Sequence, residues 1–540
     1  MKLKAPNLLK QLMKEKYIFL LCIVVTLIPV LFFRFFPTLD GAAHLYNSNL
    51  LNEIFFESNP TISSFFVANN KPVPNLTGHI ILSFFNLFLP AFLAEKAFLI
   101  LYITGLSYSF RSLIKAINRE NKIASYFIFP FVYSFVFILG FYNFSIALVF
   151  LLITLSYWIS LKEKPFDKTA IAKLFLLLSL TFFSHIFVFA VLLMSLGILF
   201  LVTEIKVYFT TENQKKTILK TSFKKFGALL VSALIPFLLF VHYFYSRPPA
   251  NKLEYLPQGE LIDNLFSFRA LLSYNSYEEN QYLEIISTTL LALFFLAIFS
   301  RMRLWISDKK IGGKKISFFK IQDLWLIISS VLLIMYFTLA DSTSYGGFVT
   351  TRVSLVLYLT IILWIAANSL PKWVLSLAAI AVFYAHFHLV SYYGSITKNL
   401  NNIALDCEEA SSKMNENSVV LPLNYSDEWL ALHFSNYLGI EKPLIILDNY
   451  EAVNDYFPLI WNWPFLTVPI YENIAKNNFL CIDSATYLNQ ANFDVDYVFV
   501  LGDINSKQDD CAADKKQELL LLTNLIFENE NCQVYEFKKR

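Results

Sequence analysis

The sequence predicts a polytopic α-helical membrane protein of about eleven transmembrane helices with a C-terminal soluble α/β domain. Hydrophobic residues make up 56% of the chain and charged residues 16%, whereas average soluble proteins are about a quarter charged. The apolar residues come in runs of roughly 17–20, the length that crosses a bilayer. Segments rich in Lys and Arg lie between these runs and fall on one alternating side. That side is cytoplasmic by the positive-inside rule.

The first element is the apolar run at 17–36, which five lysines precede. A charged start before an apolar run also fits a cleaved signal peptide. This run is long, however, and no small-residue cleavage site follows it. We therefore expect an uncleaved signal anchor with a cytoplasmic N-terminus.

Ten further crossings follow, one within 77–110 and the others at 124–140, 143–160, 171–184, 185–204, 226–245, 284–300, 323–340, 351–369 and 372–389. The stretch 77–110 contains two apolar runs separated by Ala94-Glu95-Lys96, but the charge pattern permits only one net crossing. We expect the first run, His79–Leu93, to lie in the interface or to re-enter the membrane. Eleven crossings place the C-terminus outside the cytoplasm.

The composition changes after the transmembrane domain, which we assign to residues 1–393. Residues 394–540 contain 10 basic and 22 acidic residues, and this length is sufficient for a separate core. Strand-like runs (418–423, 443–447, 497–501, 533–537) alternate with helix-like ones (403–415, 428–437, 516–527), which predicts an extracytoplasmic α/β or α+β domain.

Four of the five cysteines lie in that segment: Cys407, Cys481, Cys511 and Cys532. An even set outside the cytoplasm suggests disulfides. Cys511 with Cys532 is the pairing we favour, because it would join a helix to the terminal strand; four buried thiols are the alternative. The sequence contains no CxxC motif, zinc spacing, Walker loop, Gly-rich dinucleotide loop or basic nucleic-acid patch outside the cytoplasmic lysines.

The outer loop 37–76 begins PTLDGAAHLYNSNLLNEIFF. In a helix that starts at Asp40, His44 and then Asn47 point the same way. A neighbouring apolar stripe predicts an amphipathic helix along the outer membrane surface. Asp40 is a candidate general base, and His44 could orient it, share a metal with it or contact a phosphate. The structural alternative is that Asp40 is an N-cap and His44 an interfacial polar residue.

All seven histidines fall on the side opposite the lysines, together with other polar residues that we expect to rim an outward-facing cavity. The candidates for binding substrate or phosphate are His79, Asn143, His185, Asp341, Arg352 and Lys71. Arg352 is the best phosphate ligand among them, because its planar guanidinium is permanently charged. Singly, each of these residues also fits an ordinary position at a helix end.

The loop PTLDGAAH after the first span, the segment NKPVPN, the two apolar runs ending in RSLIKAINREN, and the later Ser-His turn resemble the GT-C fold of integral-membrane glycosyltransferases. The likeness covers roughly residues 1–390 in layout. It implies an enzyme that takes a hexose or pentose from a polyprenyl-phosphate donor. Such an enzyme would lie in the cell membrane, which in bacteria is the inner or plasma membrane. The acceptor would be a glycan, lipid or protein. The matching position for the family's catalytic base is Asp40. Metal use stays open, because Asp40 lacks the acidic pair of the metal-dependent branches.

Two other classes remain. A transporter or lipid flippase would have a similar number of spans, but it should show ionisable residues near mid-membrane or internal repeats. An O-antigen-ligase-like enzyme would also act outside on polyprenyl substrates, with its large outer loop between late spans. A member of the fold that has lost catalysis and only scaffolds a surface pathway is a third alternative.

Overall fold

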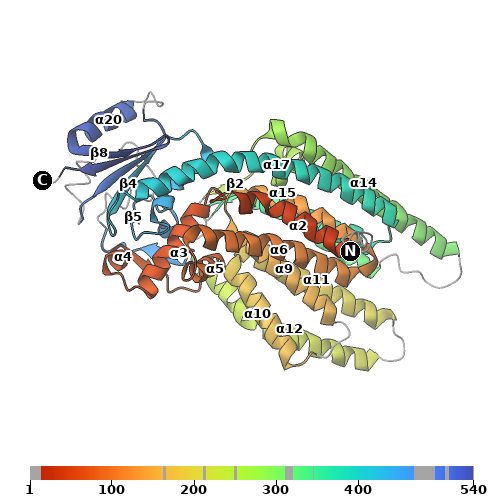
Figure 1. Ribbon diagram of the computed structural model, residues 1–540. Helices are drawn as coiled ribbons and strands as arrows, with labels where there is room; N and C mark the ends of the chain where they lie inside the picture. The colour runs from red at the N-terminus through yellow and green to blue at the C-terminus, as the bar shows by residue number, and fades with distance from the viewer. Residues whose placement is uncertain are drawn as a thin grey trace, which may run out of the picture. The chain divides into compact units, whose positions relative to one another are not determined.

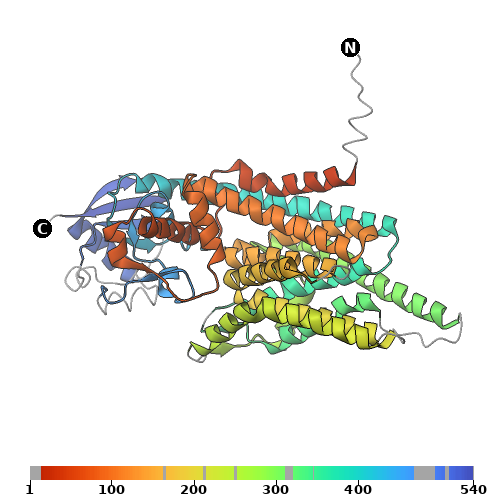
Figure 2. The same cartoon turned by 90° about the horizontal axis from the view of Figure 1, so that it is seen from below.

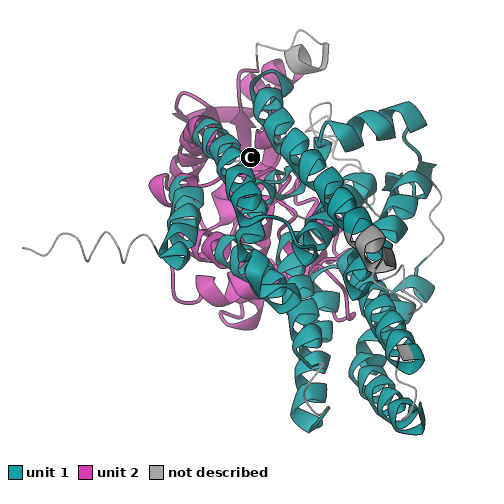
Figure 3. Ribbon diagram, turned by 90° about the vertical axis from the view of Figure 1, so that its right-hand side faces the viewer, with its two compact units in different colours: residues 1–28, 102–138, 144–392 teal, residues 29–101, 139–143, 393–540 magenta. Residues whose placement is uncertain are grey.

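A computed structural model describes residues 14–161, 166–210, 215–247, 252–310, 320–344, 346–466, 493–504 and 510–538. The chain divides into two compact units (Figure 3). Unit 1 comprises residues 1–28, 102–138 and 144–392, and unit 2 comprises residues 29–101, 139–143 and 393–540. The outer loop 37–76 therefore belongs to the same compact unit as the C-terminal segment.

Long apolar helices dominate the described chain. They are α2 (Glu15–Phe32), α6 (Ala91–Ile117), α9 (Tyr142–Ser160), α10 (Lys168–Ser184), α11 (Ile186–Thr210), α12 (Lys215–Tyr245), α14 (Ser276–Lys310), α15 (Leu324–Thr338), α16 (Val349–Ala367) and α17 (Lys372–Ser411). Nine of the helices in the described ranges are long and apolar enough to cross a membrane. At 17 residues, α10 is one residue shorter than the shortest of these nine, which have 18 residues. Within unit 1, α10 packs on α11 and α12 (Figures 1 and 2). Helix α15 packs on α16. The membrane class is confirmed.

The prediction of one membrane helix over 124–140 is wrong. This stretch contains the 3₁₀ helix η1 (Arg119–Ile128) and two single turns, α7 (Phe129–Val132) and α8 (Phe135–Ile138). Pro130 lies in the first turn of α7, where its missing N–H is tolerated, but it prevents a continuous α-helix from running through from η1. Aromatic and β-branched residues around it favour helix only weakly.

The structure agrees with a single crossing in 77–110. The first run forms α5 (Thr77–Asn86), whose 10 residues are too few to span a bilayer. The second run forms α6, which has 27 residues. Ile80 and Phe84 on α5 are exposed while His79 and Leu82 are buried, so this short helix has one apolar outer face.

Short elements connect the helices of unit 1: β2 (Leu253–Glu254), α13 (Gln258–Phe266), η3 (Arg269–Leu271), η4 (Ile321–Asp323) and β3 (Ser342–Thr343). Strands β2 and β3 pair antiparallel. Of the two, β3 lies close to the start of α16 in sequence.

A five-stranded sheet forms the C-terminal part of unit 2, in the order β5 (Ile445–Ile446), β4 (Val419–Asn424), β7 (Tyr497–Leu501), β9 (Cys532–Phe537) and β8 (Thr523–Glu528). Strands β5, β4 and β7 are parallel, and β9 runs antiparallel to β7 and β8 (Figure 1). The central strand β7 is buried along its whole length. The four predicted strands are confirmed.

The predicted helices of this segment are only partly correct. Residues 403–411 continue α17 rather than starting a new helix. Residues 428–437 form the 3₁₀ turns η5 (Trp429–Ala431) and η6 (Phe434–Gly439). Helix α20 (Asp510–Leu522) ends early, and the following residues form β8, because they pair with the terminal strand β9.

Strand pairing joins the outer loop to the C-terminal segment inside unit 2. After α4 (Pro60–Phe65), β1 (Phe66–Ala68) pairs antiparallel with β6 (Leu459–Trp461). The Phe66 ring stacks on Trp461 with 4.2 Å between centroids. Next to β6 lies the 3₁₀ turn η7 (Glu451–Val453). These pairings bring residues about 400 positions apart in the chain into one core.

Helix α3 (Gly41–Phe55) is buried in that core, so the prediction of an amphipathic helix along the membrane surface is wrong. It packs on α5 and on η6. Its Tyr46 hydroxyl donates to the carbonyl of Leu444 at 2.6 Å and accepts from the amide of Ile446 at 3.1 Å. Gly439 permits this contact, because a Cβ there would lie 2.4 Å from the Tyr46 ring. The helix is thus held against the edge strand β5.

Candidate active site

Asp40 lies at the N-terminus of α3, but its side chain makes no capping hydrogen bond to the first turn of that helix. Its amide donates to the carbonyl of Leu139 at 3.3 Å. Gly140, at φ +79°, packs against the same backbone, and a Cβ there would lie 2.6 Å from the Asp40 nitrogen. Glycine is the residue that accepts both this conformation and this approach. Capping of α3, the structural alternative for Asp40, therefore does not account for the position of its carboxylate.

The Asp40 carboxylate faces two residues from the C-terminal segment. Its Oδ1 lies 3.7 Å from Nε2 of His433, and the His433 ring stacks on Tyr450 with 4.3 Å between centroids. Burial lowers the pKa of His433 to about 4, although the charge of Glu451 raises it, so this imidazole is neutral near pH 7. Burial raises the pKa of Tyr450 well above its usual value, and the negative charge of Asp40 adds to this. Tyr450 thus remains a protonated phenol near the carboxylate.

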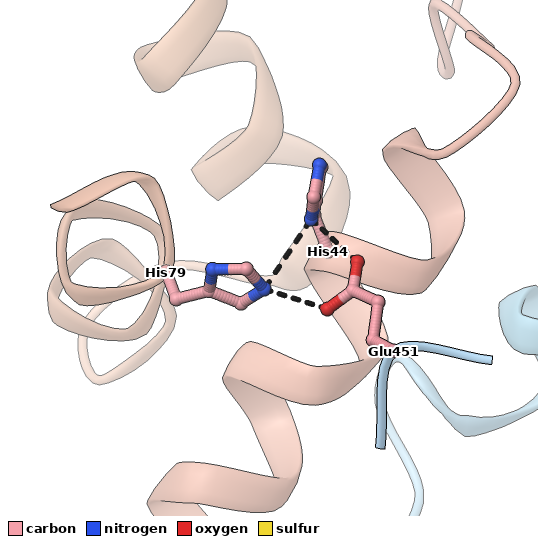
Figure 4. A group of neighbouring side chains, drawn as sticks. All are labelled: His44, His79 and Glu451. Carbon is pink, nitrogen blue, oxygen red and sulfur yellow. Dashed lines mark hydrogen bonds and ion pairs between the residues drawn. The ribbon is translucent and has the colours of Figure 1, made fainter. Parts of the chain in front are cut away.

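Three buried side chains, those of His44, His79 and Glu451, lie together (Figure 4). His44 is one turn further along α3 than Asp40. Glu451 Oε1 lies 2.5 Å from His44 Nδ1, and its Oε2 lies 2.7 Å from His79 Nε2. The two imidazole nitrogens are 3.3 Å apart. Their exposures are 4% for His44, 0% for His79 and 1% for Glu451. We call these three residues the His-His-Glu cluster.

Each imidazole of the cluster also contacts a backbone carbonyl through the nitrogen that does not face Glu451. His44 Nε2 lies 2.9 Å from the carbonyl oxygen of Gly140, and His79 Nδ1 lies 3.1 Å from that of Asn75. A carbonyl only accepts hydrogen bonds, so these contacts favour the tautomers with the proton on these nitrogens; Asn143 Nδ2 lies farther from His79 Nδ1, at 3.5 Å. The other nitrogen of each ring points at Glu451.

Amides support the carboxylate of the cluster. Asn47 Nδ2 donates to Glu451 Oε2 at 3.0 Å, and Asn449 Nδ2 donates to Asn47 Oδ1 at 2.7 Å. Burial raises the pKa of Glu451, but the charges and hydrogen bonds of the two histidines outweigh this and lower it to about 2. Burial likewise lowers the pKa of His44, yet the Glu451 carboxylate raises it on balance. Glu451 is therefore a carboxylate near pH 7.

A second buried acid lies beside the start of α3. The Tyr142 hydroxyl donates to Glu95 Oε1 at 2.9 Å and accepts from Thr38 Oγ1 at 3.2 Å. A Cβ on Gly41 would lie 2.7 Å from that hydroxyl. Glu95, which in the sequence only separated two apolar runs, therefore helps to fix the turn that presents Asp40.

The other predicted site residues have varied surroundings. In unit 2, the Asn143 Oδ1 atom accepts from the amide of Gly78 at 2.7 Å, next to His79, whereas Lys71 is exposed and lies 3.6 Å from Asp455. In unit 1, Asp341 Oδ1 accepts from the amide of Thr350 at 2.9 Å, which makes it a cap for α16. His185 and Arg352 interact electrostatically in unit 1.

The arrangement of the cysteines differs from the disulfide pairing that we favoured from the sequence. The sulfur of Cys532 lies 3.6 Å from that of Cys407, and both are buried free thiols. The side chain of Cys511 and all of Cys481 lie outside the described residues. The Cys511–Cys532 disulfide stays a prediction, and Cys407 is the sulfur that the structure places beside Cys532.

Sequence reasoning missed Glu451, His433 and Tyr450 as site residues. Glu451 lies in the polar segment DNYEAVNDY, which has no helical or strand periodicity. One weak sequence signal pointed to His433 as a site residue, because every histidine of the chain was assigned to the same side of the membrane. Tyr450 had none, since it is one of 29 tyrosines.

Comparisons with known proteins bear on the fold. No family model matches the sequence, and no curated protein matches it. Among solved structures, the chain is similar to ArnT from Cupriavidus metallidurans, whose crystal structure was determined bound to undecaprenyl phosphate. The TM-score is 0.50 at 10% identity, and the match covers 96% of this chain and 97% of ArnT. The chain therefore has the GT-C fold, as the sequence led us to expect.

Proposed function

We propose that this protein is a membrane glycosyltransferase, which moves a sugar from a polyprenyl-phosphate-linked donor to an acceptor hydroxyl on the extracytoplasmic face. The observation behind the proposal is the Asp40 carboxylate. It begins α3 without capping that helix, and it lies near the Tyr450 phenol and a neutral His433. An aspartate so placed can take a proton from a hydroxyl group. The match to a GT-C fold along nearly the whole chain supports a lipid-linked donor.

The proposed reaction is one displacement at the anomeric carbon of the sugar. The acceptor oxygen forms a bond to that carbon while the bond from the carbon to the phosphate oxygen breaks. The electron pair of the broken bond leaves with the polyprenyl phosphate, and the acceptor proton passes to Asp40. Because the donor is a lipid, it reaches the protein by lateral diffusion, and no nucleotide-binding loop is needed.

Arg352 is the residue that we propose for the leaving phosphate. It lies in the first turn of α16, and its charge is permanent. A fixed positive charge at the phosphate would favour bond breaking, because negative charge builds up there in the transition state. Arg352→Lys should therefore weaken donor use more than it weakens folding.

The direct test uses membranes that contain the full-length protein and a polyprenyl phosphate bearing a labelled hexose or pentose. We expect transfer of label to endogenous acceptors together with release of polyprenyl phosphate, both absent from membranes without the protein. A transporter or flippase would move the labelled lipid across the bilayer and leave the sugar–phosphate bond intact. Transport without bond cleavage would overturn the proposal.

The face of the membrane can be tested separately. Reporter fusions after residues 120, 215 and 310 should report the cytoplasm, and a fusion at residue 540 should report the opposite side. A cytoplasmic C-terminus would contradict a site facing outward, because Glu451 and His433 belong to the C-terminal segment.

A further inference from the structure

We propose that the His-His-Glu cluster binds a divalent transition metal ion, with Zn²⁺ as the best match. His44 Nδ1, His79 Nε2 and a Glu451 oxygen would be its protein ligands. The inference does not depend on the proposed transferase activity, since metal content and stability are measured without any donor.

The lone pairs of the two imidazoles converge on one point. His44 and His79 each point one nitrogen at a backbone carbonyl, at 2.9 Å and 3.1 Å. A neutral ring in that tautomer has a bare lone pair on its other nitrogen. Both bare nitrogens face each other at 3.3 Å and also face the Glu451 carboxylate. Three lone-pair donors directed at one point repel one another unless a cation lies between them.

The chemical types of the three donors and the spacing between them also fit a transition metal ion. Two imidazoles and one carboxylate suit zinc and similar first-row ions, whereas Mg²⁺ and Ca²⁺ prefer all-oxygen sites. Zinc–nitrogen bonds of about 2.0–2.1 Å in a tetrahedral arrangement place two ligand nitrogens roughly 3.3 Å apart. The two nitrogens are separated by 3.3 Å. The carboxylate oxygens lie closer, at 2.5 Å and 2.7 Å, and would move slightly outward around an ion.

The groups that surround the three ligands also match those around a bound metal ion. Metal-bound histidines nearly always donate their second N–H to a carbonyl or carboxylate, and bound carboxylates are themselves hydrogen-bonded. Both features are present, through the carbonyls of Gly140 and Asn75 and through the amide of Asn47. All three ligands are more than nine-tenths buried. The site therefore lies inside the core of unit 2 and not on its surface.

The competing explanation is a cluster held by protons alone. If both imidazoles were doubly protonated, each could donate to Glu451, but two positive rings would then lie 4.8 Å apart by their centroids in a buried site. One carboxylate cannot neutralise both. A metal ion uses the same geometry with neutral rings, and so it removes this repulsion between the two histidines.

The ion would join three segments that are distant in sequence. His44 belongs to α3, His79 to α5 and Glu451 to η7. A bound metal would therefore fix the start of α3, which presents Asp40, against the segment that contributes Tyr450. Because a preformed site is absent from the unfolded chain, binding would also stabilise unit 2.

The test uses full-length protein purified in detergent through an affinity tag without histidine, because a polyhistidine tag binds zinc itself. Elemental analysis should find about one zinc ion per chain in the wild type. Glu451→Gln and His79→Gln should lose it, with affinity at least about 10-fold weaker. The matched control is His433→Gln, a buried histidine of the same unit outside the cluster, which should retain the metal.

A second measurement needs no variant. Wild-type protein stripped with a chelator should unfold at a lower temperature, and Zn²⁺ alone should restore the original midpoint, whereas Mg²⁺ should not. Wild-type protein without zinc, and with a midpoint that does not respond to added Zn²⁺, would overturn the proposal in favour of the proton-held cluster. Equal zinc content in wild type and Glu451→Gln would overturn the assignment of these ligands.

Discussion

His79 and Glu451 are 372 positions apart in the sequence, yet their side chains lie 2.7 Å from each other in the buried core of unit 2. The outer loop and the C-terminal segment thus share one core. Asp40, the residue we propose as general base, lies at the N-terminus of a helix that contacts both. Mutations in the C-terminal segment should therefore affect chemistry that the sequence places in the first outer loop.

Asp40→Asn should abolish sugar transfer while leaving the fold intact. The amide has nearly the size of the carboxylate but cannot accept the proton of the acceptor, so we expect transfer to fall by about 10²-fold or more. Loss of stability should be small, because the carboxylate does not cap α3. The measurement is transfer from the polyprenyl-phosphate donor in membranes with matched protein amounts. Asp448→Asn, another buried acid of unit 2, is the control, and full activity of Asp40→Asn would refute the assignment.

Tyr450→Phe should reduce the turnover number more than it reduces stability. The change keeps the ring that stacks on His433 and removes a nearby hydroxyl that can donate to Asp40 during the reaction. Loss of one hydrogen bond to a charged group corresponds to roughly tenfold in rate. Initial rates at saturating donor should reveal this loss. An unchanged turnover number would mean that the phenol does not position the carboxylate.

Gly140→Ala should destabilise the protein and impair activity together. The backbone at φ +79° disfavours a side chain, and the new Cβ would lie 2.6 Å from the Asp40 nitrogen and 2.8 Å from its Cβ. We expect a loss of about 1–3 kcal/mol in the free energy of unfolding, measured from thermal midpoints in detergent. Gly394→Ala is the control, because no atom lies within 4 Å of its added Cβ. A neutral Gly140→Ala would show that the turn before α9 can relax.

The free energy of unfolding should fall as the pH rises from about 4 to about 7, because of the titration of Asp448. Burial raises the pKa of Asp448 to about 7, although the Ser435 hydroxyl lowers it. Below about pH 4 the carboxyl is protonated in both the folded and the unfolded chain. As the pH rises, the unfolded chain ionises first, so the stability present at low pH is lost progressively up to the folded-state pKa.

Asp448→Asn removes this titration, so the variant should be more stable than the wild type at pH 8 and close to it at pH 4. The difference should be a few degrees in the thermal midpoint, at about 2–4 °C for each kcal/mol. Asp455→Asn, a half-exposed aspartate of the same segment, should show no such trend. Parallel pH curves for wild type and Asp448→Asn would refute the assignment.

Cys407 and Cys532 should form a disulfide if unit 2 faces an oxidising compartment, because their sulfurs already lie 3.6 Å apart. Alkylation before and after reduction, read by mass spectrometry, should show both thiols protected until reduction. Cys407→Ser should free Cys532 for labelling, and Cys511→Ser should not. The reverse result would instead establish the Cys511–Cys532 pairing expected from the sequence.

The sequence alone determined the membrane class, the single long helix within 77–110, the four strands of the acidic segment and the candidacy of Asp40 and His44. These depend on local properties: apolar run length, charge between runs, period-two patterns and a four-residue spacing in one helix. It failed over 124–140, where Pro130 prevents a continuous helix, and for α3, which is buried rather than lying along the membrane surface.

Only the tertiary structure decided what surrounds Asp40 and His44. Tyr450, Glu451 and His433 come from a segment about 400 residues later, and they reach α3 because β1 pairs with β6 and Tyr46 bonds to the edge strand β5. Such pairings arise from backbone hydrogen bonds and packing between distant segments. No periodicity along the chain encodes them, so a buried glutamate in a polar stretch looks like any solvated acid until the core forms around it.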